Sequence, residues 1–143
     1  MTFSSGPEDE VQERVEPLNE AELRWVADNV AEAQKAAEER GLAEGEIRPR
    51  ALDELWALLL SERLDDPNAL INLVGLALGQ LLVDRFGLDW VALTDQHGTE
   101  IAVRGPSNLT VFPTNFVAKR YETRETGFIA PFVDEVARKL ERL

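Results

Sequence analysis

Residues 68–104 set the architecture of the chain; they read NALINLVGLALGQLLVDRFGLDWVALTDQHGTEIAVR. Apolar side chains occupy most sides of the first part, residues 68–86, which predicts a helix that is buried around most of its circumference. After Gly87 the periodicity changes, and two runs rich in Val, Leu, Ile and Trp, residues 89–94 and 99–104, flank an Asp-Gln-His-Gly turn. This pattern is typical of a β-hairpin. The stretch therefore predicts a central helix followed by two antiparallel strands.

Two glycines, Gly75 and Gly79, leave one ridge of this helix without side chains. Glycines four residues apart occur in membrane helix dimers. However, the apolar run over residues 70–83 contains Asn72 and Gln80 and is shorter than the roughly 20 residues that a bilayer span needs. The glycines therefore predict that a strand or another helix approaches the backbone closely. We expect this helix to be the buried core of the chain and not a membrane span.

Shorter elements follow the hairpin. A Gly-Pro-Ser-Asn turn at residues 105–108 leads to a third β-type run, residues 109–112, which Pro113 ends. The apolar spacing over residues 114–122 suits one or two helical turns, and residues 129–143 carry apolar side chains at helical spacing. We expect a three-stranded meander and a closing amphipathic helix.

The N-terminal half has the pattern of two helices. Asn19 and Glu22 have the spacing of a capping box, and apolar residues then recur at intervals of three and four as far as Gly41. A second helix with a wider apolar face ends before Asp66 and Pro67. An Asp followed by Pro at the first helical position is a favourable start for the central helix.

Together these elements predict an α+β fold, in which N-terminal helices and a buried helix pack on a three-stranded antiparallel meander, with a C-terminal helix. Helices are expected mainly on one face of the sheet. We divide the chain into a flexible acidic leader (1–17), an N-terminal helical hairpin (18–66) and an α-β-β-β-α domain (67–143). The leader is expected to be flexible because it carries few apolar side chains.

The composition excludes several functional classes. Because the 143 residues include no cysteine and one histidine, His97, we exclude disulfides, thiolate catalysis and metal sites built on two histidines. The 27 acidic and 15 basic residues give a net charge of −12, which argues against nucleic acid and anionic membranes as partners. The first residues form no apolar signal segment, so we expect a cytoplasmic protein.

The charge is unevenly distributed along the chain. Residues 1–66 carry 18 acidic and 7 basic side chains, whereas residues 67–143 carry 9 and 8. Within the nearly neutral half, four cations are the candidate anion-binding residues: Arg104, Lys119, Arg120 and Arg124. An arginine fork and a lysine near the start of a short helix can bind a phosphate or a carboxylate. The alternative is that they form structural ion pairs, which we favour because no glycine-rich phosphate loop accompanies them.

Other polar and aromatic residues favour structural roles. Asp95, His97 and Glu100 surround the hairpin turn, where Asp and Gly are expected for backbone reasons, and no spacing enforces a metal site. Packing between elements is expected for all three tryptophans: Trp25, Trp56 and Trp90. Serine nucleophile motifs, P-loops and dinucleotide-binding glycine motifs are missing, so we assign no catalytic, cofactor-binding or metal-ligating residues.

One combination of motifs resembles a known family. A Leu-Gly-Gln at residues 78–80 precedes GLDWVALTD at residues 87–95, an F-P at residues 112–113 and a K-R at residues 119–120. In this order they resemble the bacterial family of domains of unknown function numbered 3806. The similarity covers roughly residues 68–124 and is weaker through the first helix. It implies a bacterial, cytosolic protein, and it supplies neither an activity nor site residues.

Two functions are consistent with the sequence. The first is a non-enzymatic protein-interaction or accessory module, which binds a protein partner or forms a homodimer. Its acidic amphipathic N-terminal half suits a basic partner, and the sequence contains no set of nucleophile, metal or cofactor residues. The alternative is a binding domain or enzyme for a small anionic ligand that uses Arg104, Lys119 and Arg120, with Tyr121 or His97 nearby. The alternative requires these groups to converge on one pocket.

Overall fold

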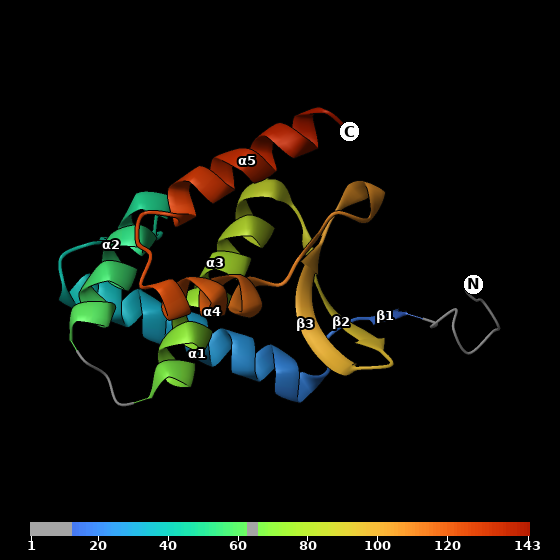
Figure 1. Cartoon of the computed structure of the whole chain (residues 1–143), viewed down its shortest axis with the longest axis horizontal. Coiled ribbons are helices and arrows are strands. Elements are labelled where there is room, and N and C mark those ends of the chain that lie inside the picture. Colours follow the sequence, from blue (N-terminus) through green and yellow to red (C-terminus); the bar gives the residue numbers. More distant parts are fainter. Residues whose placement is uncertain (1–12, 63–65) are drawn as a thin grey trace.

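Four strands and five α-helices make up the part of the chain that the computed structural model describes, residues 13–62 and 66–143 (Figure 1). In chain order the elements are β1 (Arg14–Glu16), α1 (Glu20–Glu39), α2 (Pro49–Ser61), α3 (Pro67–Phe86), β2 (Asp89–Asp95), β3 (Gly98–Arg104), the short 3₁₀ turn η1 (Pro106–Asn108), β4 (Thr110–Val111), α4 (Pro113–Thr123) and α5 (Ile129–Glu141). The helices lie on one side of the sheet. The predicted α+β class is confirmed.

The hairpin of β2 and β3 is the centre of the sheet. The two strands pair antiparallel from Asp89 opposite Arg104 to Asp95 opposite Gly98, which leaves a two-residue loop. Within the turn, the main-chain N–H of His97 donates to Asp95 Oδ1 at 2.7 Å, and Gly98 has a φ of +121° that favours glycine. The predicted hairpin is therefore confirmed, together with its turn.

The prediction of three strands is wrong, because the sheet has the order β1-β2-β3-β4. In β1, Val15 lies opposite Leu93 of β2, although all three β1 residues are exposed. A three-residue strand without a buried face leaves no alternation of apolar and polar residues to detect, and for this reason the sequence predicts a flexible leader here. Residues 1–12 of that leader lie outside the described residues.

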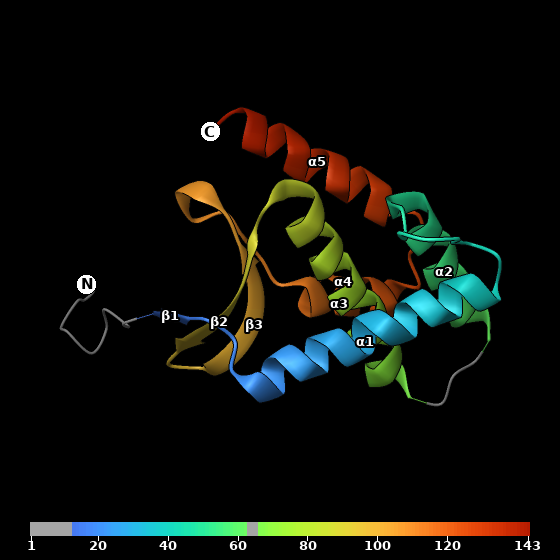
Figure 2. The same cartoon turned by 180° about the vertical axis from the view of Figure 1, so that it is seen from behind.

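Helix α3 is the core helix, as expected. By length and composition alone it could cross a membrane. In the fold, however, α1, α2, α4 and α5 all contact it, and Leu70, Val74, Leu78 and Leu82 belong to one core cluster with residues of these helices (Figure 2). Its burial is therefore that of the central helix of a small domain.

Both glycines of α3 lie where another segment approaches the helix, as predicted. A Cβ atom built on Gly75 would lie 2.8 Å from the Thr114 Cα of α4. A Cβ atom built on Gly79 would lie 2.8 Å from Cζ2 of Trp90 in β2. Real Cβ atoms essentially never come this close to other heavy atoms. These two glycines therefore allow α4 and the hairpin to pack directly on the α3 backbone.

Residues of α2 hold the start of α5 in place. The Asp53 carboxylate accepts hydrogen bonds from the main-chain N–H groups of Ile129 and Ala130, both at 2.8 Å. Trp56 Nε1 donates to the main-chain oxygen of Glu125 at 2.9 Å. Since the first N–H groups of a helix have no partner within the helix, a carboxylate from another element stabilises α5 in this position.

The capping box at the start of α1 is confirmed: Asn19 Oδ1 accepts from the Glu22 N–H at 2.8 Å, and Glu22 Oε1 accepts from the Asn19 N–H at 2.9 Å. Trp25 is less buried than expected: 38% of this residue is exposed, although it borders residues of β3 and the start of α4. It lies on α1 beside the stripe formed by Val26 and Ala33, which contact the core. An isolated helix pattern does not reveal which apolar residues extend beyond the buried stripe.

An ion pair joins the C-terminal ends of α1 and α2 and gives the fold a pH dependence. Arg40 Nη2 lies 2.8 Å from Glu62 Oε1, and this hydrogen-bonded guanidinium lowers the pKa of Glu62. The pair therefore stabilises the fold above the unfolded-state pKa of glutamate, and this contribution is lost as the pH falls through the folded-state pKa. We expect Glu62→Gln to lower the melting temperature slightly at about pH 7 and hardly at all at about pH 3. Thermal melts at both pH values test this; an equal difference at both would contradict it.

Candidate functional site

The candidate site is built on one face of α4. Phe116, Lys119 and Arg120 share this face because their spacings of three and four residues bring side chains together on a helix. The guanidinium carbon of Arg120 lies 3.8 Å from the centre of the Phe116 ring, and Arg120 Nη1 donates to the Phe116 main-chain oxygen at 3.2 Å. The cation–π contact and the hydrogen bond together restrict the position of the guanidinium.

Helix α5 supplies the opposite wall. Its residues Phe132, Val136 and Lys139 have helical spacing and lie along one face toward α4. The Phe132 ring stacks on the Phe116 ring, with 4.1 Å between the ring centres and 29° between the planes. This stacked pair forms an apolar contact between the two helices.

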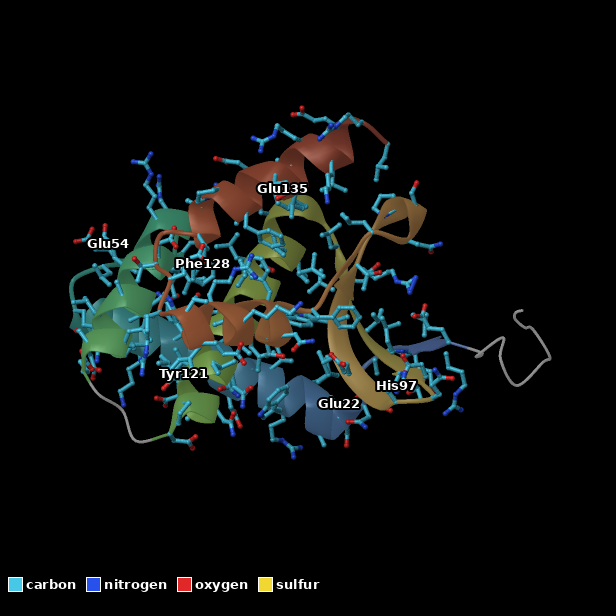
Figure 3. The ribbon with its side chains drawn as sticks, in the orientation of Figure 1. Glu22, Glu54, His97, Tyr121, Phe128 and Glu135 are labelled. Carbon is cyan, nitrogen blue, oxygen red and sulfur yellow. The ribbon has the colours of Figure 1, made fainter. Side chains whose placement is uncertain are left out.

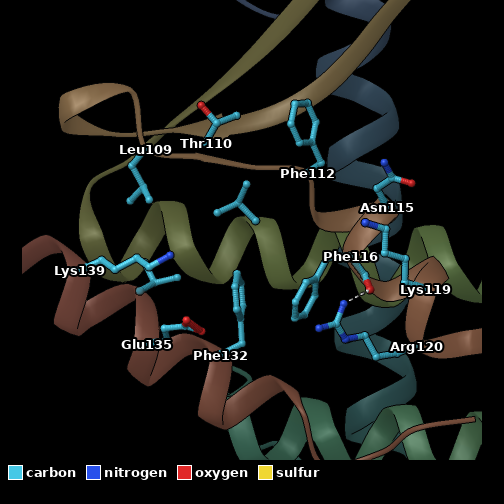
Figure 4. A pocket seen from close by; sticks show the side chains of 12 residues that line it. Leu109, Thr110, Phe112, Asn115, Phe116, Lys119, Arg120, Phe132, Glu135 and Lys139 are labelled. Atoms are coloured by element: carbon cyan, nitrogen blue, oxygen red, sulfur yellow. Dashed lines mark hydrogen bonds between the residues drawn. The ribbon is translucent and has the colours of Figure 1, made fainter. Parts of the chain in front are cut away.

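A cavity of about 250 Å³ opens between α4, α5 and the segment that contains β4, and we call it the α4–α5 pocket (Figure 4). Its lining consists of Leu109, Thr110, Val111, Phe112, Asn115, Phe116, Lys119, Arg120, Phe132, Glu135, Val136 and Lys139. In the close view, Lys119 and Arg120 lie at one end and Glu135 and Lys139 at the other, with the two stacked rings between them. The pocket thus combines an apolar floor with charged groups at both ends.

The charge of the pocket differs from that of the whole chain. Three basic residues and one acidic residue line it: Lys119, Arg120, Lys139 and Glu135. Over residues 13–62 and 66–143 neither Arg120 nor the two lysines are found in an ion pair. Arg120 Nε is shielded from solvent and finds no acceptor within the same residues. A shielded guanidinium N–H without an acceptor favours an anion near this side chain.

Only two of the four predicted anion-binding residues meet in this pocket. Lys119 and Arg120 line it, whereas Arg104 lies in β3, where its Nη2 is 2.8 Å from Glu13 Oε1 and its Nη1 donates to Asn108 Oδ1 at 3.2 Å. Arg104 therefore forms the structural ion pair that the sequence favoured for the cluster. This ion pair also connects Glu13, just before β1, with β3, the strand of the hairpin that does not pair with β1.

Arg124 and Tyr121 form a separate pair at the end of α4. Arg124 caps the helix in the left-handed conformation, with a φ of +57°, and its guanidinium carbon lies 4.6 Å from the centre of the Tyr121 ring. The Tyr121 ring also makes an edge contact with Trp56, with 6.4 Å between the ring centres. Neither residue lines the α4–α5 pocket.

His97 lies at the tip of the hairpin, away from the pocket (Figure 3). It lines a small hollow of about 50 Å³ together with Asp95 and Glu100. In the described part of the chain no three His, Asp or Glu side chains converge as metal ligands would. The structure therefore brings none of the imidazole chemistry to the α4–α5 pocket.

The contribution of α5 to the pocket is not predicted from the sequence. Lys139 is separated from Lys119 and Arg120 by a turn and most of a helix, so no local motif includes it. A usable signal was the spacing of Phe132, Val136 and Lys139, which places the lysine at the end of an apolar stripe. Which helix that stripe would face could not be read from the spacing.

Comparison with protein families identifies the domain. The family model described as domain of unknown function (DUF3806) matches residues 51–132, which is more than half of the chain. The chain belongs to this family. No curated protein and no solved structure matches the chain. The matched part of the DUF3806 domain runs from α2 to the first turn of α5, and so includes the hairpin, α4 and most of the pocket lining.

The residues that carry the sequence resemblance to DUF3806 have two different structural roles. Gly79 and Gln80 accommodate Trp90: the glycine leaves space for the indole ring, and Gln80 Oε1 accepts from Trp90 Nε1 at 3.0 Å. Lys119 and Arg120, in contrast, line the α4–α5 pocket. The motif therefore includes the contact between α3 and β2 as well as the two cations of the candidate site.

Proposed function

We propose that this DUF3806 domain is a non-enzymatic binding module whose α4–α5 pocket takes a small organic anion, namely a carboxylate attached to an aromatic ring or a short apolar body. The observation that carries the proposal is that Lys119, Arg120 and Lys139 line one cavity with an aromatic floor. The pocket has the features that a small-ligand site requires: it is concave, its lining is largely apolar, and it holds a few polar groups.

The floor favours a ligand with an apolar part. Phe116 and Phe132 are both partly buried and pack against the core, so their exposed edges are the apolar surface of the cavity. A ring or short alkyl chain that covers them gains about 25 cal/mol for each Å² removed from water. Inorganic phosphate would leave this surface uncovered, and we therefore expect it to bind more weakly than an aromatic carboxylate.

The cations at the two ends of the pocket favour a ligand that carries a carboxylate. Arg120 is held by Phe116 and provides a planar donor group, whereas Lys119 and Lys139 provide flexible charges from two helices. Because the guanidinium is already restrained, little of its conformational entropy is lost when it binds an anion. Glu135 at the Lys139 end disfavours a second negative charge there, so a monoanion is the expected ligand.

The lining supports binding rather than catalysis. Its described residues include one hydroxyl, on Thr110, and one carboxylate, on Glu135, and no histidine, serine or cysteine. A nucleophile with an adjacent base is therefore not assembled in the cavity. The proposal includes a cytoplasmic setting, which the burial of α3 as a core helix supports, and a bacterial source, which the resemblance to the family implies.

A thermal shift measurement tests the ligand class. A ligand at about ten times its Kd stabilises the folded state by about 1.4 kcal/mol, which raises the melting temperature of a domain of this size by roughly 4 °C. We expect such a rise with millimolar benzoate, a smaller one with acetate and inorganic phosphate, and none with benzyl alcohol, which has the ring but no charge. Equal shifts with benzoate and benzyl alcohol would contradict the role of the cations.

Variants assign the shift to the pocket. The double variant Lys119→Gln with Lys139→Gln is expected to remove most of the benzoate shift, because two of the three cations of the lining are neutralised. Arg124→Gln is the matched control: it also removes a basic residue from the end of α4, but Arg124 lies over Tyr121 and outside the pocket. If the double variant keeps the full shift, or if benzoate gives no shift in the parent protein, the proposed site is wrong.

A further inference from the structure

Strand β3 has an edge that is paired over only part of its length. Strand β4 contains two residues and pairs with Val103 and Arg104 alone. Within residues 13–62 and 66–143 no strand pairs with this edge over Gly98–Ala102. An open strand edge offers main-chain donors and acceptors to another extended chain.

The hydrogen-bonding direction identifies the residues that offer these groups. Directly after β3, the Gly105 N–H donates to the Leu109 main-chain oxygen at 2.8 Å, so Gly105 directs its main-chain groups toward the β4 side. Because this direction alternates along a strand, Val103, Ile101 and Thr99 direct theirs to the same side. Val103 faces β4, which leaves the main-chain groups of Ile101 and Thr99 for the open edge.

A groove runs along this part of the edge. It has a volume of about 350 Å³ and is lined by Glu22, Trp25, Thr99, Glu100, Ile101 and Thr114, and we call it the β3-edge groove. The groove lies between the start of α1 and the hairpin, which are adjacent in Figure 2. In Figure 3, the label of Glu22 marks the start of α1 and the label of His97 marks the tip of the hairpin. Trp25 is 38% exposed beside the groove, so a large aromatic surface is available to an incoming side chain.

The charge around the groove indicates a basic occupant. Its two charged lining residues, Glu22 and Glu100, are both acidic. Helix α1, which forms one wall, carries six acidic and two basic side chains. A second copy of this chain would bring another net charge of −12 to the surface, so electrostatics disfavours self-association here and favours a cationic segment.

We propose that an extended, basic segment of a partner protein adds as a strand to the open edge of β3, with main-chain hydrogen bonds to Thr99 and Ile101 and an apolar side chain packed on Trp25. Addition of a strand to a sheet edge supplies affinity through the main chain and selectivity through alternate side chains. The proposal concerns a surface separate from the α4–α5 pocket, since the two share no lining residue.

Nuclear magnetic resonance titration with designed peptides tests this interaction. The probe is a peptide of the same length as β3, 7 residues, that alternates lysine and valine, and its counterpart replaces lysine by glutamate. At low ionic strength we expect the basic peptide to shift the amide signals of Thr99 and Ile101 and the Trp25 indole signal, at a Kd below about 1 mM. The acidic peptide should leave these signals unchanged.

Two changes separate strand addition from simple charge attraction. Methylation of alternate main-chain nitrogens of the basic peptide keeps its charge but removes the donors, and is expected to abolish binding. Trp25→Ala is expected to weaken binding at least about tenfold, because exposed aromatic anchors dominate small interfaces. The matched control Leu58→Ala removes another partly exposed apolar side chain, on α2 and outside the groove, and should leave the Kd unchanged.

Several results would overturn the proposal. They are the absence of binding by the basic peptide at low salt, equal binding by the methylated or the acidic peptide, and signal changes centred on α4 and α5 instead of Thr99 and Ile101. Concentration-dependent self-association that broadens the same signals without peptide would assign the edge to a second copy of the chain and would also overturn it.

Discussion

Gly79→Val is expected to prevent the chain from reaching its native fold. A Cβ atom at position 79 would lie 2.8 Å from Trp90 Cζ2 and 3.0 Å from Pro113 Cγ. The indole ring cannot simply move away, because Trp90 Nε1 donates to Gln80 Oε1 on the same helix. The strain of overpacking and the lost contact between α3 and β2 together cost about 3 kcal/mol or more, a large part of the stability of a domain.

Circular dichroism and thermal melts measure this effect, with Gly45→Ala as the control. Gly45 lies in the loop between α1 and α2 and has no atom within 4 Å of a built Cβ, so its substitution is expected to leave the melting transition nearly unchanged. Gly75→Val should behave like Gly79→Val, because the Thr114 backbone lies in the way. A soluble Gly79→Val variant with the parent melting temperature would show that α3 and the hairpin are not closely packed.

Trp56→Ala is expected to destabilise the domain by about 3–5 kcal/mol, the range for deletion of a large buried aromatic side chain. Trp56 has no exposed surface. Its ring makes edge contacts with Phe128, at 5.9 Å between ring centres, and with Tyr121 at 6.4 Å. Its removal would leave a cavity among α2, α4 and α5 and would leave the Glu125 main-chain oxygen without its donor.

Denaturant unfolding of two further variants separates the causes. Trp56→Phe keeps most of the ring volume but removes the N–H donor, so a loss of about 1–2 kcal/mol is expected. Trp25→Ala changes the same residue type at a site that is 38% exposed, and should cost clearly less than Trp56→Ala. Equal losses at positions 25 and 56 would contradict the assignment of Trp56 to the core that anchors α5.

The features that sequence analysis predicted correctly depend on contacts between residues that are close in the chain. The capping box of Asn19 and Glu22 closes within one helical turn, and the hairpin turn closes within the four residues from Asp95 to Gly98. The burial of α3 follows from its apolar composition on most sides, for any arrangement of its neighbours. The need for glycine at positions 75 and 79 could be predicted in the same way, although not which segments approach them.

The remaining features depend on segments that are distant in the chain. Strand β1 forms because β2 has a free edge, and its own exposed side chains contain no sign of this. Arg104 and Arg120 have the same local chemistry, yet one pairs with Glu13 and the other lines a cavity with Lys139. A cation becomes part of an ion pair or of a binding site according to which groups packing brings within a few ångströms. The family and the α+β architecture were therefore accessible from residue order, whereas the two surfaces proposed for binding exist because α1, α4 and α5 pack around one helix and one hairpin.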